Sequence, residues 1–490
     1  MNFVTDVLRA LPADRPALVS ISAEGERVEW SRDECDRRSA SMSAALAAAG
    51  VPRGGVVMTV IGSRPEWVWT MIACMRSGFV ALAASEQLRA GDLELRYRQA
   101  LPSAIVADER NREAVEASSP PCPVIWIPDE AIWELEGPEP VDLDPLEPGF
   151  VMFTSGTTGE PKAVVHGQRY VTGQELQATR WLDARPGDLV WCTAAPGWSK
   201  SARNVFMAPW VGGASALIHD ARFDPAQRVE LLEREPVNVL CMAPTEYRVL
   251  VRRAEPRPVE GLRSAVAAGE ALGPEVLGAF HEATGLWIRD GYGQTETGHT
   301  VAHLAGTTPP PGAMDRPMPG VRMRVDDGEL CLDPLSDPTF FLGYVGEGVS
   351  HDGAGNWEVT DRREGGEWRS GDRVHEDEDG YLYFEAREDD VIISAGYRIG
   401  PVEVESALMG HEAVAEAAAV GAPDEERGQV VRAVVVLRSG YEPSEALVTE
   451  LQEHAKAVTA PYKYPRIIEF TDELPRTTTG KLRRASLRGE

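Results

Sequence analysis

The chain has 490 residues, a length that predicts two or three domains because a single hydrophobic core stops growing well below this size. An apolar content of 43% with 26% charged residues is typical of a globular protein and excludes a disordered or fibrous one. The formal net charge of −28 disfavours a general binder of nucleic acid or of anionic membranes, because the summed field repels phosphate polymers. An anionic small substrate would therefore need a locally basic pocket.

The cysteines are scattered along the chain and form no CxxC pair, so they predict reduced thiols and neither a disulfide framework nor a zinc site. The N-terminus lacks the charged-then-apolar pattern of an export signal. The apolar run "WVWTMIACM" is cut short by Arg76, so no membrane insertion is expected. The expected location is the cytoplasm.

Helix-like and strand-like segments alternate through most of the chain. Residues 31–50 open with a Ser cap and stop at Gly50, which predicts a helix. A short apolar strand at 55–63 and a second helix at 65–78 follow. Further β-rich runs, separated by helix-length spacers, lie at 188–195, 215–219, 237–243 and 263–270. This alternation predicts an α/β fold with parallel sheets covered by helices.

The pattern changes after Gly320. Residues 320–333 and 380–400 alternate apolar and polar side chains around Asp-Gly turns, which predicts antiparallel hairpins. We therefore place a domain boundary between residues 388 and 389. Residues 1–388 are expected to form a large N-terminal domain of helix-covered sheets with a small β-barrel-like subdomain. Residues 389–490 are expected to form a small, mobile α+β domain.

The segment "FTSGTTGEPK" (153–162) combines glycines, hydroxyls and a lysine directly after an apolar run. Glycines allow close backbone approach, and exposed N–H groups with hydroxyls and Lys162 suit a polyphosphate. The alternative is an ordinary Gly/Thr turn between two strands. The segment is not a Walker loop, because Pro161 stands where that loop has its second Gly.

Three further clusters carry possible chemistry. "RDGYGQTETG" (289–298) fails as a dinucleotide fingerprint, since Glu296 takes the third glycine position, but Glu296 could hold a magnesium ion that bridges phosphates. Asp372, after Gly371, could accept hydrogen bonds from a ribose diol, or it belongs to the solvated acidic surface around it. The basic tail "LPRTTTGKLRR" is either a frayed terminus or a loop that brings Lys481 to developing negative charge.

Five motifs in this order resemble those of the AMP-forming acyl-CoA synthetases: "FTSGTTGEPK", "GYGQTETG", "SGD", "REDDVIISAGYRIGPVEVESAL" and "LPRTTTGKLRR". This superfamily also includes the adenylation domains of peptide synthetases and the luciferases. The resemblance covers nearly the whole chain, and residues 196–214 and 460–466 look closest to the medium-chain acyl-CoA synthetase branch.

The resemblance implies a two-step reaction that uses ATP, Mg²⁺ and coenzyme A. A carboxylate attacks the α-phosphate of ATP to give an acyl-adenylate and pyrophosphate, and a thiol then displaces AMP. The expected partners are a small carboxylic acid, ATP and CoA, with a free-standing carrier protein as a possible further partner and without nucleic acid or membrane insertion. The expected assembly is a monomer or a homodimer.

The resemblance also assigns site residues. Catalytic roles fall to Lys481, Glu296 and Thr154, with Glu296 on the metal. The nucleotide is expected to lie against Thr154, Ser155, Gly156, Thr157, Thr158 and Lys162 at the β- and γ-phosphates, Gly269, Glu270, Ala271, Asp290, Gly291 and Tyr292 at the adenine, Thr295 at the α-phosphate, and Asp372 and Arg387 at the ribose.

Asp389 matches the hinge about which the C-terminal domain is expected to rotate between the two half-reactions. This rotation would withdraw Lys481 and bring Gly396 beside the pantetheine thiol. Arg398 would then face a phosphate, and Lys456 is a candidate contact for a CoA phosphate.

The acyl pocket is expected around Trp198, Lys200, Ala267 and Gly293. In acetyl-specific relatives a Trp fills the position of Gly293, so its absence predicts a pocket that extends past two carbons. Each further buried methylene contributes about 0.8 kcal/mol, which favours medium-chain, branched or aryl acids. Lys200 either extends outwards or recognises a polar or second carboxylate group on the acid.

Other functions remain open at this stage. A stand-alone adenylation enzyme that loads a free-standing carrier protein would carry the same motifs. A non-catalytic nucleotide or acyl-CoA binding protein would not need Lys481, Glu296 and Asp372 together. A luciferase-like oxygenase is possible in principle, because a fold does not determine a function.

Overall fold

The computed structural model describes residues 1–154, 161–270, 272–307, 310, 312–394, 397–424, 427–460, 462–477 and 481–488, without the side chains of Glu364 and Arg398. Ser155 to Thr158, Ala271 and Gly396 thus lie outside the described residues. Over the described part of the chain, no helix combines the length and the apolar content that crossing a membrane requires.

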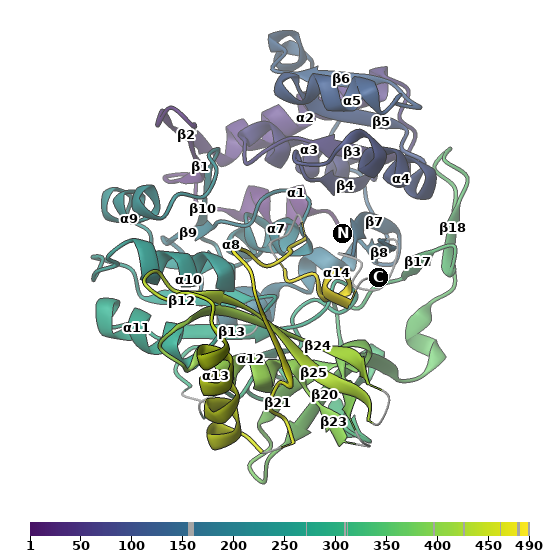
Figure 1. Ribbon diagram of the computed structural model, residues 1–490. Coiled ribbons are helices and arrows are strands. Elements are labelled where there is room, and N and C mark those ends of the chain that lie inside the picture. The colour runs from purple at the N-terminus through teal and green to yellow at the C-terminus, as the bar shows by residue number, and fades with distance from the viewer. Residues whose placement is uncertain are drawn as a thin grey trace.

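The middle of the molecule is an eight-stranded sheet with parallel strands inside and antiparallel strands at both edges. The strand order, in the described part of the chain, is β14 (Val301–Ala302), β13 (Ile288–Tyr292), β12 (Ser264–Ala268), β11 (Val239–Met242), β9 (Leu189–Cys192), β10 (Ser215–His219), β1 (Pro16–Ile21) and β2 (Arg27–Ser31). Its outer face is covered by α9 (Pro225–Arg234), α10 (Pro244–Arg253) and α11 (Pro274–Thr284), as Figure 1 shows.

A nine-stranded sheet lies above it in Figure 1. Its order is β19 (Trp357–Val359), β18 (Gly348–His351), β17 (Gly343–Val345), β8 (Ala163–Gly167), β7 (Pro148–Phe153), β4 (Val80–Ala84), β3 (Val56–Val60), β5 (Ala104–Asp108) and β6 (Val124–Ile127). Strands β4, β3, β5 and β6 run parallel, and β7 and β8 form the antiparallel hairpin that carries the 153–162 motif. The predicted parallel sheets with helical covers are therefore confirmed.

The helices of this second layer are α2 (Arg32–Ala48), α3 (Pro65–Ser77), α4 (Ala90–Ala100) and α5 (Arg112–Ala117). Ser31 caps α2 through a complete capping box with Glu34, which explains why this helix begins where the sequence predicts. Residues Trp67 to Arg76 of α3 are all buried, and their apolar side chains contribute to the core cluster that also includes side chains of the central sheet. A helix that is apolar all round is buried, as α3 is.

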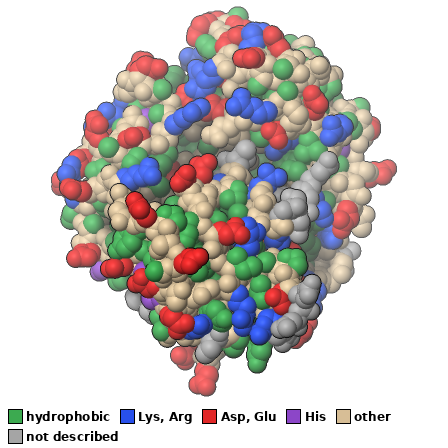
Figure 2. All heavy atoms as spheres, in the orientation of Figure 1, with side chains coloured by type: hydrophobic (Ala, Val, Ile, Leu, Met, Phe, Trp, Pro, Cys, Tyr) green, Lys and Arg blue, Asp and Glu red, His purple; other side chains and the backbone are tan. Residues whose placement is uncertain are grey.

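The predicted antiparallel region forms two small sheets. One has the order β15 (Met323–Asp326), β16 (Glu329–Leu332), β20 (Trp368–Glu376) and β21 (Leu382–Arg387). The other has β23 (Tyr397–Ile399), β22 (Ile392–Ser394), β25 (Gly428–Leu437) and β24 (Val414–Asp424), with β26 (Ile467–Phe470) paired to β25. This last sheet packs with α12 (Pro401–Met409) and α13 (Glu445–Val458) around its own core. Figure 2 shows acidic and basic side chains interspersed over the face that includes it.

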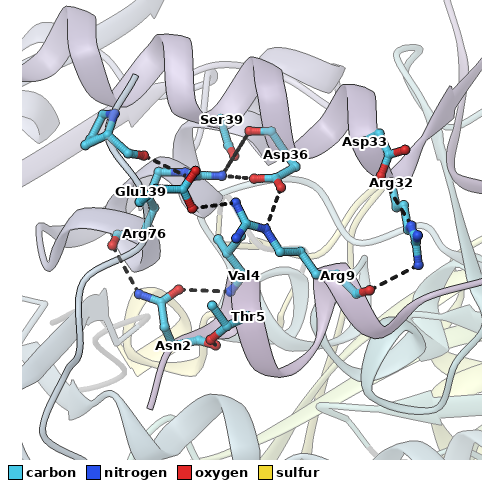
Figure 3. Close-up of polar contacts among 11 residues, drawn as sticks. Asn2, Val4, Thr5, Arg9, Arg32, Asp33, Asp36, Ser39, Arg76 and Glu139 are labelled. Atoms are coloured by element: carbon cyan, nitrogen blue, oxygen red, sulfur yellow. Dashed lines mark hydrogen bonds and ion pairs between the residues drawn. The ribbon is translucent and has the colours of Figure 1, made fainter. Parts of the chain in front are cut away.

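A buried arginine ties α3 to α2 and to the segment around Pro138 (Figure 3). Arg76 is 1% exposed and contacts Asp36, Ser39 and the carbonyl of Pro138. Burial lowers the pKa of the Arg76 guanidinium, and the Asp36 carboxylate opposes this. Asn2 adds three hydrogen bonds to carbonyls of the same region, at 2.8–3.1 Å.

The Asp36 carboxylate is therefore expected to matter for stability. Asp36→Ala leaves the buried Arg76 charge without its ion-pair partner and should lower the free energy of unfolding by roughly 3 kcal/mol. Asp33 lies on the same helix but is 83% exposed where it meets Arg32, so Asp33→Ala should change it by less than about 1 kcal/mol. Denaturant unfolding of both variants checks this, and equal effects would contradict it.

Candidate active site

The candidate site lies at the carboxyl ends of β12 and β13, the edge where open parallel sheets bind ligands. Strand β12 runs into Gly269, whose φ of +108° suits glycine. A Cβ atom at Gly269 would lie 4.0 Å from Cε of Lys481. The structure thus places the predicted catalytic lysine directly against the predicted nucleotide-binding turn.

Asp372 is the best-connected carboxylate of the site and is 3% exposed. Its Oδ2 accepts hydrogen bonds from the Tyr292 hydroxyl at 2.5 Å and from the Gln294 amide at 2.8 Å. Its Oδ1 lies 3.2 Å from Nη1 of Arg387, the residue opposite it in the β20–β21 ladder. Burial raises the pKa of Asp372, and Arg387 is the largest opposing influence.

Lys481 brings a positive charge into this acidic setting. Burial lowers the pKa of its ammonium, while the carboxylates of Glu270 and Asp372 raise it. Glu296 acts in the same direction more weakly, and Arg387 acts against them. Lys481 therefore faces carboxylates from three separate parts of the chain.

The phosphate side of the site begins at the ends of the 153–162 motif. The Lys162 amide donates to Oγ1 of Thr154 at 3.0 Å, and the Thr154 amide donates to the carbonyl of Lys162 at 3.1 Å. The Lys162 ammonium lies 4.7 Å from the ring centre of Tyr344, whose hydroxyl donates to Oε1 of Glu296 at 2.8 Å. Tyr344 thus joins the predicted phosphate lysine to the predicted metal carboxylate.

Glu296 fits a magnesium ion that a nucleotide brings with it. No group of three or more His, Cys, Asp or Glu side chains in the described ranges could hold a metal by itself. Magnesium at phosphate sites is usually bound by one or two carboxylates together with the phosphates, so a single carboxylate beside Lys162 suffices.

The predicted adenine side is held from the neighbouring helix. Glu270 accepts from the Thr245 hydroxyl at 3.1 Å and pairs with Arg248 at 3.0 Å, both on α10. Asp290 is half-buried, and the loss of hydration raises the pKa of its carboxyl, whose Oδ1 accepts from the amide of Gly291 at 2.9 Å.

The acyl pocket differs from the prediction at two positions. A Cβ atom at Gly293 would lie 1.6 Å from the carbonyl oxygen of Gly298, so the absence of a side chain allows close backbone approach and opens no space for an acid. Ala267 belongs to the cluster under α10 and α11, whereas Ala268 lies on the opposite face of β12, in the cluster that includes Ala202. Ala268, not Ala267, is therefore on the side of Trp198.

Lys200 does not extend outwards, which settles one of the two predicted alternatives. It lies on α7 (Ser199–Asn204) and is 6% exposed. Its ammonium donates to the carbonyl of Met242 at 2.6 Å and to that of Ala268 at 3.4 Å, at the carboxyl ends of β11 and β12. An apolar cavity lies beside α7 and is lined in part by Trp198, Ala202, Met71, Phe150 and Met152.

The C-terminal domain contributes the remaining predicted residues. Asp389 lies in the 3-10 turn Glu388–Asp390 that follows β21, and its Oδ1 lies 3.5 Å from Nε of Arg387. Lys456 pairs with Glu453 at 2.6 Å and lies 4.3 Å from the ring centre of Tyr464, so its described contacts are not with the site around Lys481. Arg398 is on β23, and its side chain lies outside the described part of the structure.

Sequence reasoning missed Gln294 and Tyr344. Gln294 carries a signal, because it stands inside the "GYGQTETG" motif. Tyr344 carries none, since it sits in an apolar stretch and reaches Glu296 only because β17 pairs with β8.

Comparison with known proteins agrees with this arrangement. The family model "AMP-binding enzyme" matches residues 5–344, and "AMP-binding enzyme C-terminal domain" matches residues 403–481. An uncharacterized acyl-CoA ligase of Bacillus subtilis, YtcI, is 37% identical over 97% of this chain and 93% of its own. The mitochondrial acyl-coenzyme A synthetase ACSM3 of Mus musculus is 36% identical over 99% and 90%.

A solved structure of similar shape is the anthranilate CoA ligase AuaEII in complex with anthranoyl-AMP. It superposes with a TM-score of 0.86 at 26% identity and covers 100% of this chain and 97% of its own.

The fold and the family models define the class: the chain belongs to the AMP-binding enzymes. Within this class its full-length relatives place it among the acyl-CoA synthetases, which are ligases.

The close approach at Gly293 generates a testable expectation. Gly293→Ala forces the 298–299 backbone to move and should lower the midpoint of thermal unfolding clearly, because overpacking typically costs 1–3 kcal/mol. Gly278 lies inside α11 with open space at its Cβ position, so Gly278→Ala should raise the midpoint slightly. Two unchanged midpoints would refute the packing argument.

Proposed function

We propose that this enzyme joins a carboxylic acid to coenzyme A through an acyl-adenylate, with ATP converted to AMP and pyrophosphate. The observation that carries the proposal is the position of Lys481, which lies against Gly269 and faces Glu270, Asp372 and Glu296. Full-length relatives named as CoA ligases or synthetases support CoA as the acceptor, rather than a carrier protein.

In the first half-reaction a carboxylate oxygen of the acid attacks the α-phosphorus and the bond to pyrophosphate breaks. Negative charge then gathers on the α-phosphate oxygens, where Lys481 is proposed to stabilise it, with Thr295 at the same phosphate. Thr154 and Lys162 are proposed to bind the departing phosphates, and Glu296 to hold the magnesium ion that neutralises them. Asp372 is proposed to accept the ribose hydroxyls, oriented by Arg387.

In the second half-reaction the CoA sulfur attacks the acyl carbonyl carbon, AMP leaves and the thiol proton is released. We propose that residues 389–490 rotate about Asp389 between the two steps. Arg387 contacts both Asp372 and Asp389, so it links the ribose carboxylate to the proposed hinge. Gly396, Arg398 and Lys456 stay proposals for the CoA side.

The acid is proposed to be larger than acetate, of medium-chain, branched or aryl type. The apolar side chains around Trp198 and Ala202 support this, because burying apolar atoms against them is favourable, although the cavity between them is only about 10 Å³. Gly293 does not support a larger acid, because the backbone of Gly298 occupies the space beside it. We further propose that the enzyme works in the cytoplasm, as a monomer or a homodimer.

Lys481→Ala is expected to lower adenylation by about 10²–10³-fold, because one positioned charge on the reacting phosphate is lost. Thioester formation from a supplied acyl-adenylate should persist. ATP–pyrophosphate exchange and thioester assays measure the two steps separately, and Arg483→Ala, an exposed neighbour, is the control. Loss of both half-reactions would contradict the role given to Lys481.

The dependence of the adenylation rate on pH should reflect the ionisation of Lys481. The protonated form is the active one, so the rate falls as the pH rises through its pKa, which burial places below the ordinary lysine value. Glu270→Gln removes the carboxylate that raises this pKa most, and the alkaline limb should move to lower pH. A limb that stays in place would exclude Lys481 as the titrating group.

Asp389→Pro should block the second half-reaction while adenylation continues, because proline fixes φ at the proposed hinge. Asp389→Ala removes the same carboxylate without fixing φ and is expected to keep both steps. Single-turnover thioester formation from bound acyl-adenylate distinguishes the two variants. Unchanged thioester formation in Asp389→Pro would refute the hinge.

The proposed function as a whole is tested by pyrophosphate release with ATP, CoA and a panel of acids from acetate to decanoate, including branched and aromatic acids. Release with thioester formed on medium, branched or aryl acids supports the proposal. Adenylate formation without thioester would favour a carrier-loading enzyme. No pyrophosphate release with any acid would overturn the proposed function.

A further inference from the structure

Two buried cations on α7 lie beside the proposed acyl cavity. Lys200 and Arg203 are three positions apart along the chain and therefore lie next to each other on one helical face. They are 6% and 5% exposed. Ala202, next to Arg203, lines the apolar cavity, so α7 presents both an apolar and a cationic surface to the interior.

The positions of these cations point towards the reacting end of the site. Lys200 reaches the carboxyl ends of β11 and β12 through the carbonyls of Met242 and Ala268. Nη1 of Arg203 lies 3.4 Å from where a Cβ of Gly298 would be, in the loop that also carries Thr295 and Glu296. His299 of that loop is 7% exposed and packs edge-on against Trp181 at 4.2 Å.

These groups are not neutralised by the protein. Within the described ranges, neither Lys200 nor Arg203 forms an ion pair, and Nε and Nη1 of Arg203 have no hydrogen-bond partner. Both ring nitrogens of His299 are likewise unpartnered in this part of the structure. A buried cation without a counter-charge costs several kcal/mol, which a purely apolar acid would not offset.

The carboxyl groups that interact with these cations in the described ranges are Asp290 and Asp337, and the thiols of Cys192 and Cys241 also lie within their influence. Asp290 is half-buried, and Lys200 is only a minor influence on the pKa of its carboxyl. Asp337 accepts two hydrogen bonds from Thr339 at 2.8 Å, and burial raises its pKa to about 7, so it is not a full counter-charge at neutral pH. A positive surplus therefore remains at the wall formed by α7 and the 298–299 loop.

We propose that Arg203, with Lys200 and His299, recognises a second anionic group of the carboxylic acid, in addition to the carboxylate that reacts. This inference rests on the proposed function and narrows its substrate class to acids with several carbons and a second carboxylate or similar anion. Arg203 supplies the planar set of hydrogen-bond donors that suits a carboxylate.

The test compares matched acids in the pyrophosphate-release assay. Succinate, glutarate and adipate are set against butyrate, valerate and hexanoate, and kcat/KM is measured for each. The wild-type enzyme should prefer the dicarboxylate at one or more lengths. Arg203→Met should lower kcat/KM for that dicarboxylate by about 10–100-fold, the usual effect of losing a hydrogen bond to a charged group, and should leave or improve the monocarboxylate.

Three further variants keep the result interpretable. Arg203→Lys retains the charge and should retain part of the preference, while Lys200→Met should weaken it if Arg203→Met fails to fold. Arg180→Met, an exposed arginine on the neighbouring helical segment 177–182, should behave as the wild type. Unfolding midpoints of all variants are measured first.

Failure of this inference is distinguishable from failure of the proposed function. Turnover of monocarboxylates with no turnover of dicarboxylates, or an unaltered preference in Arg203→Met, overturns the second-anion site alone. No pyrophosphate release with any acid overturns the proposed function as well.

Discussion

The geometry of the site depends on one buried carboxylate, Asp372. Its burial is tolerable because Tyr292, Gln294 and Arg387 satisfy it from three directions. These partners come from the edge of the central sheet and from the small antiparallel sheet, so a single group joins the two. Removing any one partner would leave a buried charge partly unpaired, which is costly.

Arg387 extends this constraint to the C-terminal domain. It lies between Asp372 and Asp389, and the next residue, Asp390, accepts from Arg484 at 3.4 Å and from Arg488 at 2.9 Å. Arg484 also pairs with Glu405 of α12 at 2.8 Å. The short helix α14 (Arg484–Arg488) that follows Lys481 is thus fastened to its own domain and to the turn before β22. A rotation of that domain would therefore move Lys481 with it.

The charge distribution explains how a chain with a formal charge of −28 can bind anions. The α7 cations are buried and Lys481 is half-buried, so their charges interact more strongly than charges at the surface, whereas Lys162 is exposed. Lys and Arg side chains also lie near the middle of the face in Figure 2. Local placement of a few cations, and not net charge, decides what the site attracts.

Much of the fold was predictable because local patterns govern it. The Ser31 capping box, the apolar strands of the parallel sheets and the hairpins after Gly320 all follow from nearest-neighbour chemistry. The ordered motifs indicated the family, and they placed Asp372, Glu296 and Lys481 in one site although these residues are far apart along the chain.

Side-chain direction and long-range contacts were not predictable in the same way. Ala267 and Ala268 differ only by the alternation of β12, so the register of the sheet decides which of them faces Trp198. Gly293 appeared to open a pocket, but the returning backbone of Gly298 fills that space. Tyr344 and Arg203 carry no sequence signal of their own. The sequence by itself determined the elements and the family, because these follow from local chemistry and ordered motifs. The tertiary structure alone decided the shape and charge of the acyl pocket beside α7, because these arise where distant segments meet.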